Sequence, residues 1–357
     1  MADDPRGRVS VIIPARNEEA NIARAVRSVE AQQSVREIIA VDDGSTDRTG
    51  EILSELAREI PALRVLRVDV LPGGWTGKSY AAATGARAAT GDWLLFTDAD
   101  TEHRAGSLEV LMERAERTGT DLLSLSPGQR VPTWWEKSVI PLVYVHLARL
   151  YKFEEVSDPD SSAAAANGQY LLIRRKAYER AGGHESVRAE ILEDVELARR
   201  VKAGGGRLLF LPGARWAETR MYETFRRMWE GWTKNLYLLY SHNLGRVVRT
   251  LAEVAILDMA LPLAFLALCV IIVLGNRNAG LAIAVVVFLA AALWRQWRYS
   301  SAIERLGFSP QLANYLLPGA ALFSLLLVNS TWAHRWRGRV EWKGREYRAG
   351  APRKEAK

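Results

Sequence analysis

The chain has 357 residues, enough for one large domain and a smaller element, and a formal net charge of +7. Its mean hydropathy of -0.09 is typical of a soluble protein, but this average combines two unlike parts. Roughly the first 250 residues have a globular composition, whereas the remainder contains long apolar runs. The single cysteine, Cys269, excludes an intrachain disulfide framework and a cysteine-based metal site.

Short β-branched runs alternate with helical patterns along the first hundred residues. Strands separated by helices in this way predict an α/β fold with a mostly parallel central sheet that helices cover on both faces. Ligands of such sheets bind at the carboxyl ends of the strands. Polar clusters follow three of the expected strands there, at Pro14–Glu18, Asp42–Asp47 and Asp98–Asp100. The expected strands are Val9–Ile13, Ile38–Val41, Arg64–Val68 and Trp93–Phe96, and the expected helices are Glu18–Gln32, Asp47–Ile60 and Lys78–Ala89.

This globular part is assigned to residues 1–245 and also contains two expected interfacial helices. The stretch 138–148 is apolar and too short to span a bilayer, so an in-plane or groove-forming helix is expected over residues 131–151. Apolar side chains recur every three or four positions over residues 220–240, with basic residues between them, which predicts an amphipathic helix. No apolar region preceded by positive charge opens the chain, so we expect the globular part to stay in the cytoplasm.

Residues 246–334 contain three apolar segments, 254–274, 279–294 and 312–333. The first has 21 residues with one charge, Asp258, and the last has 22 uncharged residues, so both can cross a hydrocarbon core of about 30 Å. The middle segment, with 16 residues, is short for a span. If all three cross, a cytoplasmic globular part puts the C-terminal tail outside, against the positive-inside tendency. A re-entrant or in-plane middle segment would return the tail to the cytoplasm, and we expect that arrangement.

The tail, residues 335–357, carries nine Lys or Arg and three Glu, so it accounts for +6 of the net charge. A basic tail can bind nucleic acid, but this one directly follows an apolar segment. An anionic lipid surface is therefore the expected partner, and nucleic acid is not. Nine of the twelve tryptophans lie in or beside the apolar and amphipathic segments, where their rings favour the membrane interface.

Two acidic clusters in the globular part have both a structural and a functional interpretation. Asp98 and Asp100 are typical turn residues, but their hard oxygens also suit Mg²⁺ or Mn²⁺, which bridge phosphates. The turn Asp42–Asp47 is explained in part by Gly44 and by a helix cap at Ser45 or Asp47. Repulsion among the three aspartates of this turn is unfavourable unless hydrogen-bond donors face them. The hydroxyls of a ribose and the N–H of a base are such donors.

Two further motifs stand at expected helix starts. The glycine-rich stretch Gly73–Lys78 lacks the spacing of a P-loop, so Lys78 either meets a diphosphate or is a solvated loop lysine. Glu193 and Asp194 begin another helix, where the macrodipole favours acids. The alternative function there is a general base that deprotonates an acceptor hydroxyl.

In this order and at this spacing, the motifs resemble those of glycosyltransferase family 2, which has the GT-A fold. The resemblance covers roughly residues 8–210. It implies a metal-dependent, inverting transfer from a nucleotide-diphosphate sugar, with a UDP-sugar favoured and Mn²⁺ or Mg²⁺ as cofactor. The motifs that carry it are Pro14-Ala-Arg-Asn-Glu18, Asp42-Asp43-Gly-Ser-Thr-Asp47, Gly77-Lys78, Asp98-Ala-Asp100 and Glu193-Asp194.

Carried over residue by residue, the resemblance implies three groups of site residues. Asp194 is the base, Asp100 binds the metal on the diphosphate, and Asp98 orients the donor. The metal neutralises the leaving diphosphate while Asp194 activates a hydroxyl on the opposite face of the sugar. The donor-binding residues are Pro14, Ala15, Arg16, Glu18, Asp43 and Lys78.

The C-terminal part resembles membrane members of the family that glycosylate lipids, such as ceramide glucosyltransferases and bacterial carotenoid- and hopanoid-associated glycosyltransferases. It implies a lipid or isoprenoid-like acceptor and a multi-pass protein of the bacterial inner membrane. Processive members and several lipid-acting ones carry Gln-x-x-Arg-Trp after the base. This chain departs from that motif, with Glu223-Thr-Phe-Arg226-Arg-Met-Trp229, which argues against polymer synthesis. Arg226 and Trp229 lie near the acceptor in one interpretation and on a surface helix face in the other.

Three other functions stay open on the residues alone. A polyprenyl-phosphate acceptor is already anionic, so a transferase acting on it would not need Asp194 as a base. A nucleotidyltransferase should have a basic triphosphate loop, but Pro14–Glu18 contains one cation and no glycine. A non-catalytic membrane scaffold would leave the carboxylate clusters unexplained.

Overall fold

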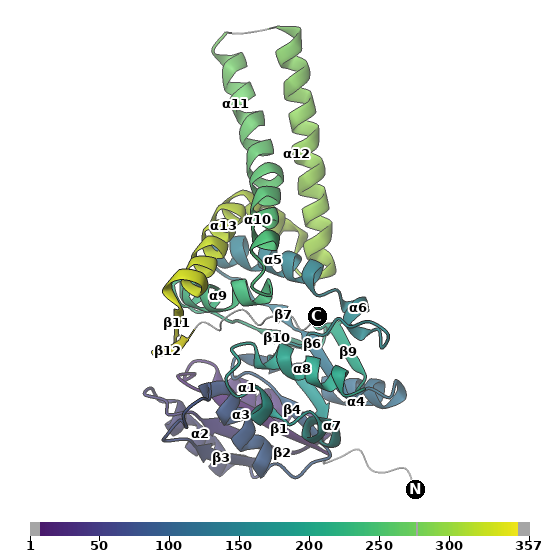
Figure 1. The fold of residues 1–357 in the computed structure, drawn as a ribbon, viewed down its shortest axis with the longest axis vertical. Coiled ribbons are helices and arrows are strands. Elements are labelled where there is room, and N and C mark those ends of the chain that lie inside the picture. Colours follow the sequence, from purple (N-terminus) through teal and green to yellow (C-terminus); the bar gives the residue numbers. More distant parts are fainter. Residues whose placement is uncertain (1–7, 276–277, 349–357) are drawn as a thin grey trace. The chain divides into compact units, whose positions relative to one another are not determined.

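The computed structural model describes residues 8–275 and 278–348 (Figure 1). Its contacts divide the chain into two units, the first comprising residues 1–130 and 151–221, and the second residues 131–150 and 222–357. The sequence grouped 131–151 and 220–240 with the globular domain. In the structure, most of these residues pack with the apolar helices of the second unit.

The first unit is built on a seven-stranded sheet in the order β3-β2-β1-β4-β8-β6-β9. Strand β8 runs antiparallel to both of its neighbours, and the other neighbouring pairs are parallel. The prediction of a mostly parallel sheet is thus confirmed. The strands are β1 (Val9–Ala15), β2 (Val35–Asp42), β3 (Leu63–Arg67), β4 (Trp93–Phe96), β6 (Leu122–Ser126), β8 (Leu171–Arg174) and β9 (Leu208–Pro212).

Helices cover both faces of this sheet, as the alternation of buried side chains in the strands requires. In β1, Val11 and Ile13 face one core with α1, α2 and α4, whereas Ile12 faces the other with α3, α7 and α8. The helices are α1 (Ile22–Glu30), α2 (Thr49–Glu59), α3 (Gly77–Ala88), α4 (Ser107–Arg117), α6 (Phe153–Ser157), α7 (Arg175–Arg180), the 3-10 turn η1 (His184–Val187) and α8 (Glu193–Ala203).

A small three-stranded sheet follows the acidic turn after β4. Strand β10 (Ala217–Thr219) pairs antiparallel with β5 (Thr101–His103) and parallel with β7 (Gly128–Gln129). Arg130 lies beside this sheet and forms ion pairs with Glu102 and Glu218. The sheet therefore anchors the chain that leaves the Asp98–Asp100 turn.

The second unit is mostly helical. Helices α5 and α13 approach so closely that a Cβ added at Gly319 would lie 2.2 Å from the Ser138 carbonyl oxygen. The Ser330 hydroxyl joins α13 to α9 by donating to the Thr233 carbonyl at 2.7 Å. The elements are α5 (Trp134–Leu150), α9 (Phe225–Leu239), α10 (Leu244–Glu253), the π-helical η2 (Val254–Ala260), α11 (Leu261–Val273), α12 (Ala279–Arg305), the 3-10 helix η3 (Pro310–Tyr315), α13 (Leu316–Trp332), the π-helical η4 (Ala333–Arg337), β11 (Arg339–Trp342) and β12 (Arg345–Arg348).

Among the described residues of this unit, three helices are long and apolar enough to cross a membrane: Leu244–Val273, Ala279–Arg305 and Pro310–Arg337. Helices α11 and α12 run side by side (Figure 1) and carry exposed apolar side chains along their length. The middle segment, expected to be short, continues beyond its apolar run to Arg305. The apolar run read from the sequence stops at Trp294, because the next residue, Arg295, is charged. In the structure the helix continues through Arg295, which pairs with Asp258. Of the basic tail, residues 349–357 lie outside the described residues.

Candidate active site

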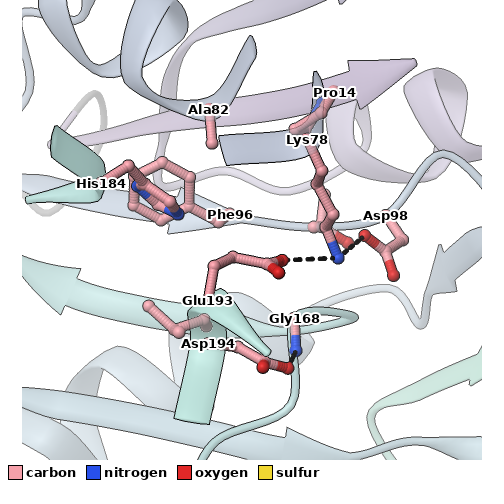
Figure 2. A pocket seen from close by; sticks show the side chains of 11 residues that line it. Pro14, Lys78, Ala82, Phe96, Asp98, Gly168, His184, Glu193 and Asp194 are labelled. Carbon is pink, nitrogen blue, oxygen red and sulfur yellow. Dashed lines mark hydrogen bonds and ion pairs between the residues drawn. The ribbon is translucent and has the colours of Figure 1, made fainter. Parts of the chain in front are cut away.

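A recess opens in the first unit beside the carboxyl ends of β1 and β4 and the amino end of α8 (Figure 2). The two strands are parallel neighbours, so the residues that follow them lie at the same edge of the sheet. Four residues predicted from the sequence line it: Pro14, Lys78, Asp98 and Asp194. The other lining residues are Ala82, Phe96, Thr97, Gly168, Leu171, His184 and Glu193.

Lys78 brings positive charge into the recess from the first turn of α3. The Thr76 hydroxyl caps this helix by accepting a hydrogen bond from the Ser79 N–H. Lys78 Nζ lies 2.7 Å from Asp98 Oδ1 and 3.2 Å from Glu193 Oε1. Desolvation lowers the pKa of Lys78, but the neighbouring carboxylates, Asp98 foremost, outweigh it and raise the pKa well above its ordinary value. Lys78 is therefore cationic throughout the physiological pH range.

Asp194 and Glu193 enter the recess from the first turn of α8. The Gly168 N–H donates to Asp194 Oδ2 at 2.7 Å, and the Val195 N–H donates to Asp194 Oδ1 at 2.8 Å. Burial raises the pKa of Asp194 to about 6 and repulsion by Glu193 adds to this, whereas Lys78 and the two N–H groups oppose the rise. Such a carboxylate is ionised at neutral pH and readily accepts a proton, as a general base must.

Asp98 and Asp100 occupy the tight turn between β4 and β5. The Thr101 N–H donates to the Asp98 carbonyl at 3.1 Å, and the Thr219 hydroxyl donates to the Asp100 carbonyl at 3.1 Å. Within residues 8–275 and 278–348, no group of three or more His, Cys, Asp or Glu side chains could hold a metal ion. Proteins usually contribute only one or two carboxylates to a Mg²⁺ site that waters and substrate phosphates complete. The turn thus fits a metal that arrives with a diphosphate.

A second group of predicted residues lies at the ends of β1 and β2, which pair in parallel. Arg16 Nη1 donates to the Asp43 carbonyl at 2.6 Å, and the Asp43 N–H donates to the Ala15 carbonyl at 2.8 Å. The Glu18 N–H donates to the Thr49 hydroxyl at 2.8 Å. These bonds hold the polar stretch after β1 against the turn after β2, so both stretches form one cluster.

Local hydrogen bonds explain two of the three aspartates in the turn after β2. Asp42 Oδ1 accepts from the Ser45 N–H at 2.9 Å, and Asp47 Oδ1 accepts from the Thr49 N–H at 3.0 Å. Gly44 takes a φ of 65°, a conformation that glycine adopts without strain. The protein itself therefore supplies hydrogen-bond donors for Asp42 and Asp47, so these two carboxylates do not require the donors of a bound nucleoside.

Residues 10–182 match the model of the family described as glycosyl transferase family 2. The chain carries a glycosyltransferase family 2 domain. Two curated relatives, from Staphylococcus aureus strains USA300 and MRSA252, are named 4,4'-diaponeurosporenoate glycosyltransferase. They are 29% and 28% identical to this chain over 345 and 344 residues, which cover 95% of it and 88% of each relative. Together these matches identify the protein as a transferase enzyme.

A solved structure confirms the fold of the glycosyltransferase. The mannosyltransferase from Pyrobaculum calidifontis in complex with GDP-Man and Mn2+ is 19% identical to it, with a TM-score of 0.51. The likeness covers 94% of this chain and 90% of that one. The predicted GT-A-like α/β fold is thus confirmed.

Two predicted site residues of the glycosyltransferase, Arg226 and Trp229, belong to the second unit. Arg226 is exposed and pairs with Glu230 at 2.9 Å, one turn along α9. Trp229 lies near Phe225, with 5.9 Å between ring centroids. These are contacts within one helix, so a role toward the acceptor stays a prediction.

Seven residues that line the recess received no role from the sequence, and three of them bear on the chemistry of the site. Glu193 pairs with Lys78, although the sequence argument assigned a role only to the aspartate that follows it. Gly168 approaches so closely that an added Cβ would lie 2.7 Å from Lys78 Nζ. His184 follows the pair Gly182–Gly183, which was the one available signal, because paired glycines mark a special turn.

Proposed function

We propose that the protein is a membrane-bound, inverting glycosyltransferase that moves a sugar from a nucleotide-diphosphate sugar to an isoprenoid-like lipid. The observation that carries the proposal is the recess of the family 2 domain, in which one lysine stands among three carboxylates. Carboxylates accept hydrogen bonds from sugar hydroxyls, and the cation attracts the diphosphate. A UDP-sugar is the favoured donor, as the family resemblance implies.

In the proposed reaction, the bond between the anomeric carbon and the diphosphate oxygen breaks, and the nucleoside diphosphate leaves. A bond forms on the opposite face between that carbon and an acceptor oxygen. If the acceptor is a hydroxyl, its proton passes to the Asp194 carboxylate, which its raised pKa supports.

The remaining residues bind and orient the donor. Asp98, held by Lys78, orients the sugar, and Asp100 would hold Mn²⁺ or Mg²⁺ on the diphosphate. When bound, such an ion would neutralise charge on the leaving group. The cluster at the ends of β1 and β2 would hold the base and ribose, through Pro14, Ala15, Arg16, Glu18 and Asp43.

The relatives' names support a carotenoid-type acceptor. The ending of 4,4'-diaponeurosporenoate denotes a carboxylate, which is anionic at neutral pH. Like polyprenyl phosphate, a carboxylate acceptor needs no base, whereas a hydroxyl acceptor does. Replacing Asp194 therefore separates a hydroxyl acceptor from an anionic one.

The three long apolar helices support a bacterial inner-membrane location, with the catalytic unit in the cytoplasm. Since α12 is long enough to span, its length no longer requires a re-entrant path. Three spans place the C-terminus outside, and the basic tail predicts the opposite. The test is labelling of Lys343→Cys, in a Cys269→Ser background, by an impermeant maleimide in intact cells. Labelling before lysis indicates three spans, and labelling only after lysis indicates two.

The activity test uses detergent-purified full-length protein, a panel of nucleotide sugars, Mn²⁺ or Mg²⁺, and a bacterial lipid extract. Wild type is compared with Asp100→Ala, Asp194→Asn and the control Asp92→Asn, an exposed aspartate just before β4, at the opposite end of that strand from the recess. We expect metal-dependent labelling of a lipid that Asp100→Ala abolishes and Asp92→Asn preserves. Loss in Asp194→Asn indicates a hydroxyl acceptor, and retention an anionic one. Absence of nucleotide-sugar binding and turnover in the wild type would contradict the proposal.

A further inference from the structure

His184 opens the 3-10 turn η1 and lines the recess, where Figure 2 shows it at the end opposite Asp98. The preceding glycines, Gly182 and Gly183, have φ values of 78° and 53°, so the chain folds back toward α7. A Cβ at Gly183 would lie 2.7 Å from the Tyr178 ring. A glycine is therefore needed to bring His184 this close to Tyr178.

The Tyr178 hydroxyl contacts both the backbone and the ring of His184. Tyr178 Oη accepts from the His184 N–H at 3.0 Å and also lies 3.0 Å from His184 Nδ1. A phenol has one hydrogen to donate, and Nδ1 is the acceptor that the structure places within its reach. When the Tyr178 hydroxyl donates to Nδ1, the ring proton is on Nε2.

Burial keeps this ring uncharged. His184 is 4% exposed, and burial, together with the nearby charge of Lys78, lowers its pKa to about 3. The ring also packs on Phe96, with 4.6 Å between centroids. At neutral pH the recess thus has an uncharged N–H donor at this end.

The other polar groups of the recess are mostly acceptors or already engaged. Three carboxylates accept hydrogen bonds, and the Lys78 ammonium pairs with two of them. The Thr97 hydroxyl donates to the Gln169 carbonyl at 2.8 Å. Each hydroxyl of a sugar both donates and accepts, so its oxygen needs a donor that carboxylates do not provide.

We propose that His184 is a specificity-determining residue that donates a hydrogen bond from Nε2 to a hydroxyl oxygen of the donor sugar. The inference rests on the proposed function, because it takes a nucleotide sugar as the ligand. Tyr178 is a positioning residue that acts through the His184 tautomer. A site that hydrogen-bonds a substrate hydroxyl discriminates against sugars that lack it.

The experiment uses detergent-purified full-length protein, the nucleotide sugar that it turns over, and the monodeoxy analogues of that sugar. His184→Phe removes the donor and keeps a ring against Phe96. In His184→Phe the Tyr178 hydroxyl loses Nδ1 as its acceptor. A second variant therefore combines His184→Phe with Tyr178→Phe, which removes that hydroxyl as well. We expect kcat/KM for the parent sugar to fall about tenfold in both variants. His184→Gln, whose amide can donate, should recover part of the loss.

Two further readouts separate recognition from a structural role. The inhibition constant of the free nucleoside diphosphate should not change in His184→Phe. One deoxy analogue should have the same kcat/KM with wild type and variant, because the contact is already missing. The loss for the parent sugar should stay constant between about pH 5.5 and 8, since the pKa of His184 is about 3.

Other outcomes overturn the inference. An equal loss for every analogue, or a parallel loss of nucleoside diphosphate binding, would show that His184 does not contact the sugar. A contribution that disappears above about pH 6.5 would indicate a cationic ring. If the wild type turns over nucleotide sugars but His184→Phe lowers kcat/KM for every deoxy analogue, this inference alone fails. If the wild type turns over none, the proposed function fails with it.

Discussion

The two units of the chain differ in how their charged side chains are compensated by opposite charge. In the recess of the first unit, one cation, Lys78, faces three carboxylates, which leaves two negative charges uncompensated when all are ionised. In the second unit, Asp258 Oδ1 lies 2.6 Å from Arg295 Nε, and the two side chains are 0% and 7% exposed. The closed pair balances its own charge, although Asp258 Oδ2 and Arg295 Nη2 are buried without a hydrogen-bond partner, whereas the recess has acceptors left for the donors of a bound molecule.

Breaking the closed pair should have the largest effect. Asp258→Ala leaves the Arg295 guanidinium buried without a counter-charge, so the free energy of unfolding in detergent should fall by about 3–5 kcal/mol. Asp258→Ala with Arg295→Met should recover most of it, because no buried charge remains. Denaturant titration followed by tryptophan fluorescence measures both variants. A double variant as unstable as the single one would contradict a self-contained pair.

Removing the cation of the recess should have the next largest effect, and on activity. Lys78→Met leaves three carboxylates facing one another and removes the charge that attracts the donor. We expect kcat/KM for the nucleotide sugar to fall about 10- to 100-fold, with a smaller loss in Lys78→Arg. Initial rates of nucleoside diphosphate release measure it. Full activity in Lys78→Met would refute a role for this charge.

The raised pKa of Asp194 predicts a pH dependence for transfer to a hydroxyl. Only the ionised carboxylate accepts a proton, so kcat/KM should rise with pH through about 6 and level off above it. At pH 5 it should be about tenfold below the plateau, since about a tenth of the carboxylate is ionised there. Lys78 lowers the pKa of Asp194, so residual activity in Lys78→Met should have a higher midpoint. A flat profile would indicate an anionic acceptor.

The smallest effect is expected at an exposed ion pair of the second unit. Arg226→Ala removes the contact with Glu230, so the free energy of unfolding should fall by about 0.3–0.5 kcal/mol. Donor hydrolysis in the first unit should not change. If transfer to lipid falls more than tenfold while hydrolysis persists, Arg226 acts on the acceptor, and the surface-face interpretation is wrong.

The sequence predicted the parallel core of the sheet well. All four expected strands, from Val9–Ile13 to Trp93–Phe96, are present, and their buried residues alternate between two helical layers. The antiparallel strand β8 was not predicted. Nothing in Leu171–Arg174 encodes its direction, because direction depends on how the connecting chain returns to the sheet. The helix expected from Glu18 begins at Ile22, because residues 19–21 form a turn before it.

For the site, the sequence by itself determined which acids and basic groups follow the strands, because the carboxyl ends of parallel strands meet at one edge. Pro14 and Asp98 could therefore be expected at one edge of the sheet, whereas Asp194, at the start of a helix, was assigned from the family resemblance. Only the tertiary structure decided the pairings within it, such as Lys78 with Glu193 and His184 with Tyr178. The physical reason is that a helix start or a glycine turn is encoded locally, whereas a side chain's partner and pKa depend on the segments that fold against it.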